Sequence, residues 1–319
     1  MRQVVRVLVA FCVLALVVAL CGCGGSGGSA GPSVGSAGKP APPPPSVPAG
    51  TLVGDGLYTM NTNGTGRTFL TSGMMPCWSP NGQQVCFTSL SNRLYTVPRS
   101  GGTPTQFTTD VEPGLPGGYD YYPAWSPDGQ RIAFERLWYD ENGTRAFIAV
   151  KDWPNGPARL ITSGGVYRDE HPTWSPDGQY VLFNRLDEAP YARLMVVAAD
   201  GGGEPYPVTA DISVSGTSDW YRDSATGENW IVYDSGSVGL YRLQVDAAGH
   251  ALGIRIALPN GGHSSYFRFP SWSPDGKFVA FDTEEATKKG AVVTTYILEV
   301  ATSALYKVGD LRNVDWAPQ

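Results

Sequence analysis

Trp125-Ser126-Pro127-Asp128-Gly129 is the stretch that decides the fold, because the chain repeats it. Three close copies and two weaker ones keep the tryptophan, which recurs at intervals of 47, 49, 46, 52 and 44 residues. The repeat tryptophans are Trp78, Trp125, Trp174, Trp220, Trp272 and Trp316. A self-similar unit of about 40 to 50 residues is typical of propeller blades, each a four-stranded sheet. The period therefore predicts an all-β propeller.

The second full copy indicates how one repeat is built. We expect its four strands at residues 123–126, 131–135, 146–151 and 158–162. Pro127 presets the first turn position, Asp128 bonds the backbone ahead of it, and Gly129 takes the left-handed conformation that closes a hairpin. Composition agrees, because 40 glycines and 26 prolines in 319 residues supply many turns, and 42% hydrophobic residues supply a large core.

The strand after each turn is apolar on both faces. It reads Ile132-Ala133-Phe134 in one copy and Val279-Ala280-Phe281 in another. A strand with this pattern is buried on both sides. Sheets that stack face to face around a ring would bury it in this way.

The turn phrase and the apolar strand after it resemble the repeats of the TolB-like β-propeller family. The resemblance covers about residues 50–319 and implies six blades of four antiparallel strands. Trp316 begins an innermost strand, whereas Thr51–Val53, Leu57–Asn61 and Thr68–Thr71 look like the three outer strands of a blade. We expect the C-terminal strand to join these N-terminal strands, which closes the ring and removes exposed sheet edges.

The first residues have the pattern of an export signal. Arg2 and Arg6 precede an apolar run, and small Gly22 stands before Cys23. The stretch Leu20–Cys23 resembles a bacterial lipobox, which implies that residues 1–22 are removed and that Cys23 carries the lipid. An uncleaved signal anchor is the alternative, although the apolar run is short for a spanning helix. We therefore expect a bacterial lipoprotein, anchored to a membrane on its periplasmic or extracellular face.

Residues 23–50 are almost entirely Gly, Ser, Ala and Pro, with a run at Pro42–Pro45. Such a segment buries too little apolar surface to fold, so we expect a tether that is stiffer through the prolines, followed by a propeller over residues 51–319. Loss of Arg2 and Arg6 with the signal takes the net charge from −6 to −8. An acidic chain without Lys/Arg clusters argues against nucleic acid as a partner.

The repeated residues are interpreted as structural. A buried tryptophan stabilises a fold by about 4–6 kcal/mol at most, so the periodic tryptophans are packing anchors. The aspartates of the turns, Asp128, Asp177 and Asp275, recur at identical places and serve turn geometry. Function is therefore expected where the repeats differ.

The residues that lead into each innermost strand meet at one mouth of a propeller's central channel. These segments are rich in aromatic, arginine and acidic side chains, and aromatic and arginine side chains supply most of the energy at binding surfaces. The candidate ligand contacts are Tyr119, Asp120, Tyr121, Tyr122, Arg168, Asp169, His171, Asp219, Tyr266, Arg268, Phe269 and Asp315. We expect a monomeric propeller that binds a protein, peptide or glycan there. The alternative is that the aromatic residues plug the channel and the charged ones are only solvated.

Acidic pairs in loops on the same face form a rim that could attract a divalent cation or a basic segment of a partner. They are Asp140-Glu141, Asp187-Glu188 and Glu284-Glu285. No cofactor other than this divalent cation is expected.

Enzymatic interpretations are weaker. Oligogalacturonate lyases carry related repeats and hold a metal with several histidines around the channel, which suggests a metal-assisted carbohydrate-processing enzyme as the alternative function. Here only His171 and His263 could reach one mouth, and they would need help from Asp169 or Asp120. Outside the Gly/Ser/Pro-rich residues 23–50, the chain also lacks the G-x-S-x-G elbow of serine hydrolases. We therefore expect no catalysis.

Cys77 and Cys86 flank the first turn phrase. A four-residue loop would place them directly opposite each other, whereas a slip of one residue would send them to opposite faces. Outside the cytoplasm such a pair can oxidise. A disulfide between Cys77 and Cys86 and two free thiols both remain open.

Overall fold

The computed structural model describes residues 49–318 except 110, 114, 141–142, 164–166, 187–191, 209–212, 215, 236–238, 254, 260–265 and 288–289. All of these residues belong to one unit of the chain, Pro40–Gln319. They form strands, turns and bends and no helix, which confirms the all-β prediction. None of the described residues therefore belongs to a helix that could span a membrane. The predicted signal at 1–22, the lipid site Cys23 and most of the tether at 23–50 lie outside the described residues.

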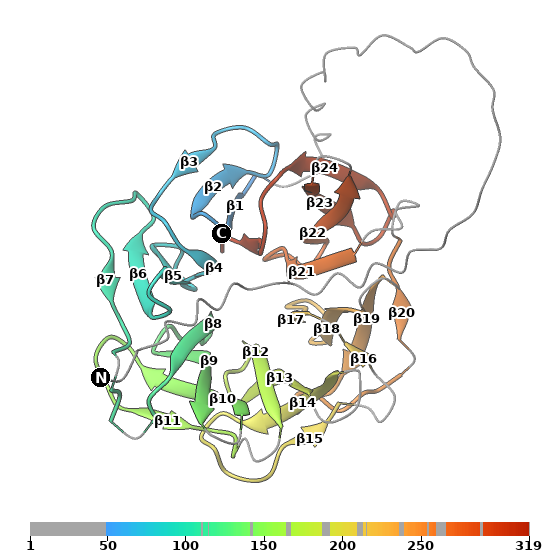
Figure 1. Ribbon diagram of the computed structural model, residues 1–319. Helices are drawn as coiled ribbons and strands as arrows, with labels where there is room; N and C mark the ends of the chain where they lie inside the picture. The colour runs from blue at the N-terminus through green and yellow to red at the C-terminus, as the bar shows by residue number, and fades with distance from the viewer. Residues whose placement is uncertain are drawn as a thin grey trace, which may run out of the picture. The chain divides into compact units, whose positions relative to one another are not determined.

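Four separate sheets have four strands each, and they stand around a ring (Figure 1). The sheet that joins the two ends has the order β25 (Asp315–Trp316), β1 (Thr51–Gly54), β2 (Tyr58–Asn61), β3 (Thr68–Phe69). The next contains β4 (Met74–Trp78), β5 (Gln84–Thr88), β6 (Leu94–Pro98), β7 (Thr105–Gln106). Another contains β17 (Ser218–Arg222), β18 (Asn229–Asp234), β19 (Leu240–Val245), β20 (Ile256–Ala257). The last contains β21 (Tyr266–Trp272), β22 (Phe278–Thr287), β23 (Gly290–Glu299), β24 (Leu305–Gly309).

The remaining strands form one nine-stranded sheet, so the count of separate four-stranded blades is four where six were expected. Its strands are β8 (Tyr119–Trp125), β9 (Arg131–Asp140), β10 (Gly143–Asp152), β11 (Ala158–Leu160), β12 (Arg168–Trp174), β13 (Tyr180–Leu186), β14 (Ala192–Ala198), β15 (Tyr206–Pro207) and β16 (Ser213–Val214). The physical reason is one parallel pair, Ala146 with Arg168, which joins β10 to β12.

The C-terminal strand completes the sheet that the N-terminal strands begin. In β25 and β1, Trp316 pairs with Leu52 and Asp315 pairs with Val53. The N–H of Ala317 then donates to the carbonyl of Thr51 at 2.8 Å. The inner edge of β1 is thereby covered by the other end of the chain.

The repeat tryptophans fill the spaces between neighbouring sheets. All but Trp125 are 4–6% exposed. Trp174 packs with Ile148 and Val150 of β10 and with Val181 of β13, so it contacts both halves of the nine-stranded sheet. The tryptophans are therefore packing anchors, as predicted from their period.

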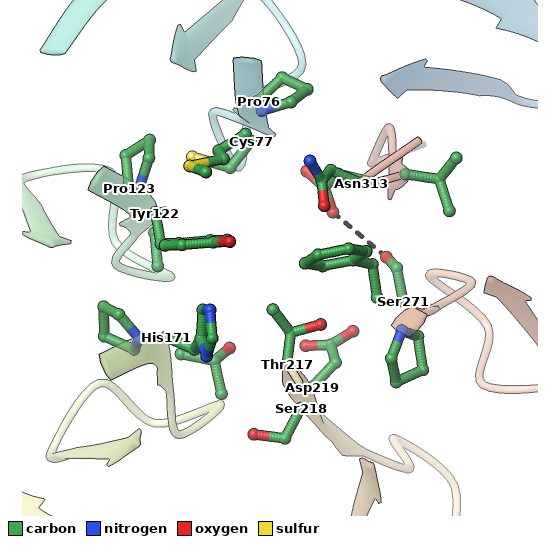
Figure 2. Close-up of a pocket in the computed structure, with 18 residues that line it drawn as sticks. Pro76, Cys77, Tyr122, Pro123, His171, Thr217, Ser218, Asp219, Ser271 and Asn313 are labelled. Carbon is green, nitrogen blue, oxygen red and sulfur yellow. Dashed lines mark hydrogen bonds between the residues drawn. The ribbon is translucent and has the colours of Figure 1, made fainter. Parts of the chain in front are cut away.

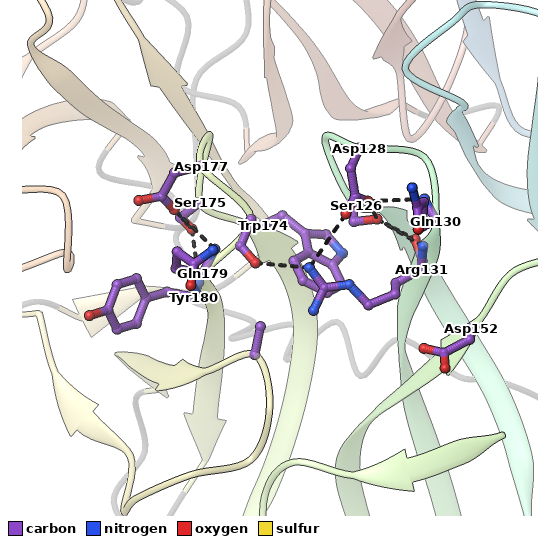
Figure 3. A network of polar contacts seen from close by, with 12 residues as sticks. Ser126, Asp128, Gln130, Arg131, Asp152, Trp174, Ser175, Asp177, Gln179 and Tyr180 are labelled. Carbon is purple, nitrogen blue, oxygen red and sulfur yellow. Dashed lines mark hydrogen bonds and ion pairs between the residues drawn. The ribbon is translucent and has the colours of Figure 1, made fainter. Parts of the chain in front are cut away.

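The turn phrase forms a local hydrogen-bond network (Figure 3). The hydroxyl of Ser126 donates to Asp128 at 2.5 Å and accepts the N–H of Arg131 at 2.9 Å, while Gln130 donates its N–H to Asp128. The guanidinium of Arg131 then lies 4.6 Å from the ring centre of Trp174 in the next repeat. The turn thus fixes a hairpin and a contact to the neighbouring repeat at once.

Candidate functional site

The segments just before the repeat tryptophans converge on one pocket in the channel (Figure 2). Its volume is about 120 Å³. Three consecutive residues from each of six segments line it: Met75–Cys77, Tyr122–Ala124, His171–Thr173, Thr217–Asp219, Phe269–Ser271 and Asn313–Asp315. Five predicted contacts are among them, namely Tyr122, His171, Asp219, Phe269 and Asp315.

Aromatic side chains occupy the pocket. Figure 2 shows Tyr122 reaching toward its middle. Its ring centre lies 4.0 Å from that of His171, edge to face, and 6.3 Å from that of Phe269. Burial lowers the pKa of His171 to about 4 and, together with nearby Glu135, raises the pKa of Tyr122. Both side chains are therefore uncharged at neutral pH, and the pocket beside them, of about 120 Å³, admits a small group.

The side chains that enter the pocket are carried by strained backbone. Five residues of the lining have positive φ angles between 48° and 55°, namely Met75, Tyr122, His171, Phe269 and Asn313. The first four precede a proline, which favours extended backbone at that position. The strand pairing shifts register at the same four places. A β-bulge therefore turns one side chain of each of these four innermost strands into the channel, and strain of this kind gathers at functional sites.

Buried carboxylates from a second layer hold this strained backbone. Asp55 accepts the N–H of Met75 at 2.7 Å, and Asp282 accepts the N–H of Asn313 at 3.1 Å. The carboxylate of Glu135 likewise accepts the N–H of His171. Burial raises the pKa of all three carboxyls, that of Asp282 to about 7. The sequence analysis missed these residues, although each lies three positions after the residue paired with a repeat tryptophan.

Asp219 and Asp315 join neighbouring sheets. Asp219 accepts the N–H of Trp272 at 2.7 Å, and Asp315 accepts the N–H of Trp78 at the same distance. Asp219 also accepts the N–H of Trp220 at 2.8 Å. Burial raises the pKa of both carboxyls, that of Asp315 to about 7, and the nearby Asp219 carboxylate also raises the pKa of Asp315. Both aspartates therefore serve the wall of the channel as well as facing it.

Asp120 and Asp169 are not in the pocket, which corrects the expectation that they face the channel. Asp120 lies across the strand pair from Arg136, and their side chains form a fully buried ion pair at 2.9 Å. Asp169 accepts two hydrogen bonds from Arg185, at 2.7 and 2.8 Å. Burial raises the pKa of Asp120 to about 6 against the opposing effect of Arg136. Each acid is held inside the nine-stranded sheet by a cation on the adjacent strand.

The other predicted contacts divide between core and rim. Tyr121 is buried against Leu137 and Ala146, which corrects its assignment to the mouth. Arg168 pairs with Glu170, and Arg268 pairs with Glu284.

Several predicted groups cannot be placed. The side chain of Tyr266 and residue His263 lie outside the described residues. So do Glu141, Asp187, Glu188 and the side chain of Asp140, while Glu285 is exposed. Within the described part of the chain, no three His, Cys, Asp or Glu side chains come together as metal ligands.

Cys77 and Cys86 are directly paired across β4 and β5, as the four-residue loop predicts, but their thiols are free. The possible disulfide is therefore absent from the structure. Burial, then the neighbouring Cys86 and Asp315, raise the pKa of Cys77. Both thiols pack in or against an apolar cluster with Ile132 and Phe134. A protonated, buried thiol is a poor reactant for oxidation.

Exposed tyrosines lie on the face where the innermost strands begin, and we call Tyr119, Tyr139 and Tyr167 the tyrosine rim. They are 39%, 47% and 37% exposed. The rings of Tyr119 and Tyr139 meet edge to face at 5.9 Å. The guanidinium groups of Arg93 and Arg185 lie 5.4 and 5.0 Å from the ring centres of Tyr119 and Tyr167.

Two further apolar side chains are exposed in loops that open on the same face. Leu90, between β5 and β6, is 74% exposed, and Val111, between β7 and β8, is 80% exposed. The sequence analysis named Tyr119 but missed the other members of this surface.

Comparison with solved structures places the fold among known propellers. TolB from Acinetobacter baumannii gives a TM-score of 0.61 at 19% identity, over 85% of this chain and 66% of that one. A putative TolB from Agrobacterium tumefaciens gives 0.58 at 18% identity, over 85% and 99%. An oligogalacturonate lyase in complex with manganese gives 0.50 at 14% identity, over 80% and 70%. At these identities the likeness concerns the fold alone.

Sequence comparison supplies the family. A search of curated proteins gives no significant match. Residues 51–220, more than half of the chain, match the family described as the TolB beta propeller domain, PD40. This match includes three intact turn phrases and extends to Trp220, the first weak copy. The chain therefore belongs to the TolB β-propeller family.

Proposed function

We propose that this chain is an exported, lipid-anchored propeller that binds a polypeptide at the cell envelope and performs no catalysis. The observation that carries the proposal is the tyrosine rim beside an aromatic channel pocket. Tyrosine and arginine are the residue types that supply most binding energy at protein interfaces, and exposed apolar surface of this kind marks interaction sites.

The pocket suggests how a partner would be recognised. A polypeptide lying on Tyr119 and Tyr167 can extend one side chain toward Tyr122 and His171. Because these two rings are uncharged and nearly fill the pocket, a small apolar or aromatic group fits better than a sugar ring. The strained bulges hold the pocket in one shape before binding, which reduces the ordering cost of association.

The proposal includes a ring of six blades. Strands β8–β11 and β12–β15 each repeat the order and the turn phrase of a blade, and a single parallel pair joins them. If these two groups of strands are counted as two blades, they make six blades together with the four separate sheets.

Export and anchoring rest on the sequence around Cys23. If Cys23 carries the lipid, Cys23→Ala should move the protein from the membrane fraction to the soluble fraction and abolish labelling by a clickable palmitate analogue. Cys21→Ala is the matched control and should change neither. Retained labelling of Cys23→Ala would contradict this part of the proposal.

The rim is tested by crosslinking in intact cells of the source organism, followed by affinity purification of the full chain. Truncating Tyr119, Tyr139 and Tyr167 to alanine together should reduce recovery of the partner polypeptide by at least about ten-fold, because hot-spot tyrosines contribute about 2 kcal/mol each. The control truncates Phe69, Leu252 and Ile256, which are exposed elsewhere. Equal recovery from both variants, or recovery of a glycan in place of a polypeptide, would contradict the proposal.

The lyase alternative gains no support from the geometry. That activity needs Asp120 or Asp169 as a partner of His171. Asp120 is instead bound to Arg136, and Asp169 is bound to Arg185.

A further inference from the structure

A second cavity, of about 380 Å³, lies at the opposite end of the innermost strands from the tyrosine rim. It shares Asp219, Ser271 and Asp315 with the channel pocket. The rest of its wall consists of the tryptophans and turn residues that follow the channel-lining segments in the sequence. Its aromatic and proline wall includes Trp78, Trp220, Tyr221, Trp272, Trp316 and Pro318. The proposed function leaves this cavity unused.

Five indoles in this wall have buried N–H groups without a partner among the described residues. They belong to Trp78, Trp125, Trp220, Trp272 and Trp316, and all but Trp125 are at least nine-tenths buried. In contrast, the indole N–H of Trp174, which is not in the wall, donates to the carbonyl of Ala124 at 2.9 Å. A buried donor without an acceptor costs about 1–3 kcal/mol. The wall therefore offers apolar ring surface, and the unpaired indole nitrogens lie buried beneath it.

This chemistry fits a polyproline II segment. Such a helix makes no internal hydrogen bonds, so its carbonyls are free to accept, and its proline rings pack on aromatic side chains. Aromatic-lined grooves are a general way of recognising it. The neighbouring prolines of the wall, Pro80, Pro127, Pro274 and Pro318, add apolar surface of the same kind.

The chain carries such a segment at the edge of the cavity. Residues 40–48 read PAPPPPSVP, with six prolines in nine residues. The segment enters the fold at Gly50, which exchanges hydrogen bonds with Thr62 at 3.2 and 3.1 Å. A Cβ placed on Gly50 would lie 2.9 Å from the indole nitrogen of Trp316, so the backbone here touches the wall of the cavity. Five residues of polyproline II, from Pro45 to Gly50, span about 15 Å.

We propose that the proline-rich segment of this chain, residues 40–48, docks in the tryptophan-lined cavity as a polyproline II helix. The docked segment fixes the direction in which the chain leaves the propeller. The linker is therefore part of the propeller's binding chemistry.

A labelled peptide tests the proposal on the full chain purified in detergent. The probe is a fluorescein-labelled peptide of residues 39–50, and binding is followed by fluorescence anisotropy. In a variant with Pro42–Pro45 replaced by serine, the peptide should bind measurably. In the unaltered chain its apparent Kd should be at least about ten-fold higher, because the linked segment competes at an effective concentration near the millimolar range.

Two controls locate the site. A peptide with the same four prolines replaced by serine should not bind. Tyr221 is half-buried, and its ring centre lies 5.6 Å from that of Trp272. In the variant with Pro42–Pro45 replaced by serine, Tyr221→Ala should abolish binding of the proline peptide. Tyr221→Phe should retain binding, because the ring supplies the contact.

Three results would overturn the proposal. Equal affinity of the unaltered chain and the serine variant would mean that a proline-rich segment of another molecule is the occupant. Binding by neither would mean that the cavity does not recognise polyproline. Unchanged binding after Tyr221→Ala would place the peptide elsewhere.

Discussion

Two kinds of repeat in this molecule hold their innermost strands in different ways. In the intact repeats the residue before the tryptophan is small, Ala124 or Thr173, and the turn after it supplies the hydrogen bonds. In the two weak repeats that residue is an aspartate, Asp219 or Asp315, whose carboxylate accepts an N–H from the next sheet. The repeat of Trp220 keeps a different turn, built on Asp223, so there the contact between sheets adds to the local hydrogen bonds.

Removing a weak repeat altogether should have the largest effect. Deletion of residues 313–319 removes β25, exposes the inner edge of β1 and forfeits the burial of Trp316, which contributes about 4–6 kcal/mol. We expect the melting temperature to fall by at least about 10 °C in differential scanning calorimetry. The control removes Gln319 alone. An unchanged melting temperature of the longer deletion would contradict closure by β25.

Breaking the ion pair of an intact repeat comes next. Asp120→Ala leaves Arg136 buried without its partner and should cost about 3–5 kcal/mol in urea unfolding. In the sheet of β21 and β22, the same two positions hold Phe267 and Thr283. The double variant Asp120→Phe with Arg136→Thr transplants that pair and should recover most of the loss. A double variant that is less stable than Asp120→Ala would mean that the pair has a role beyond its own charge.

The comparison itself is tested by truncating equivalent residues in the two kinds of repeat. Asp315→Ala leaves the N–H of Trp78 without its acceptor and should reduce the free energy of unfolding by about 1–3 kcal/mol. Thr173→Ala, at the same position of an intact repeat, should cost less. Equal losses in urea unfolding would show that the carboxylate contributes no more than an ordinary side chain.

Two buried aspartates should also make the stability of the fold depend on pH. Burial raises the pKa values of Asp282 and Asp315 in the folded chain to about 7. The native state therefore holds these protons more tightly than the unfolded chain does, so their contribution is present below a pH of about 3.9 and is lost as pH rises through 7. We expect a higher melting temperature at pH 5 than at pH 8.

A matched pair of variants assigns that dependence. Asp282→Asn with Asp315→Asn should flatten the profile between pH 5 and pH 8. The control is Asp128→Asn, because hydrogen bonds from Ser126 and Gln130 outweigh burial and lower the pKa of Asp128, so its stabilisation is lost only in acid. A profile that stays steep after the double substitution would assign the titration to other groups.

The sequence predicted the repeat structure of the fold better than it predicted the residues of the site. Periodic tryptophans and Pro-Asp-Gly turns fix the hairpins locally, and the unmatched strand at Trp316 predicted closure. The alternation of side chains along a strand could not predict which mouth residues face the channel. The bulge between Tyr121 and Ala124 turns Tyr122 into the channel and leaves Tyr121 in the core. The merging of two repeats depends on one backbone pair and leaves no sequence signal.

One missed feature did have a signal. Asp120 and Arg136 are sixteen residues apart, and so are Asp169 and Arg185, at the same places in two successive repeats. An opposite-charge pair that recurs with the period of the repeat indicates a structural role more strongly than a ligand contact. Charged residues that vary between repeats are the better candidates for binding.

The bond between Asp315 and Trp78 joins residues 237 positions apart. A chain that emerges from its N-terminus first can make every hairpin of this fold before it can make that bond, since hairpins are local and this contact is not. Until then β1 presents an unpaired edge to any passing strand. Pairing of β25 with β1 therefore removes this exposed edge and, with it, one route to aggregation of the newly made chain.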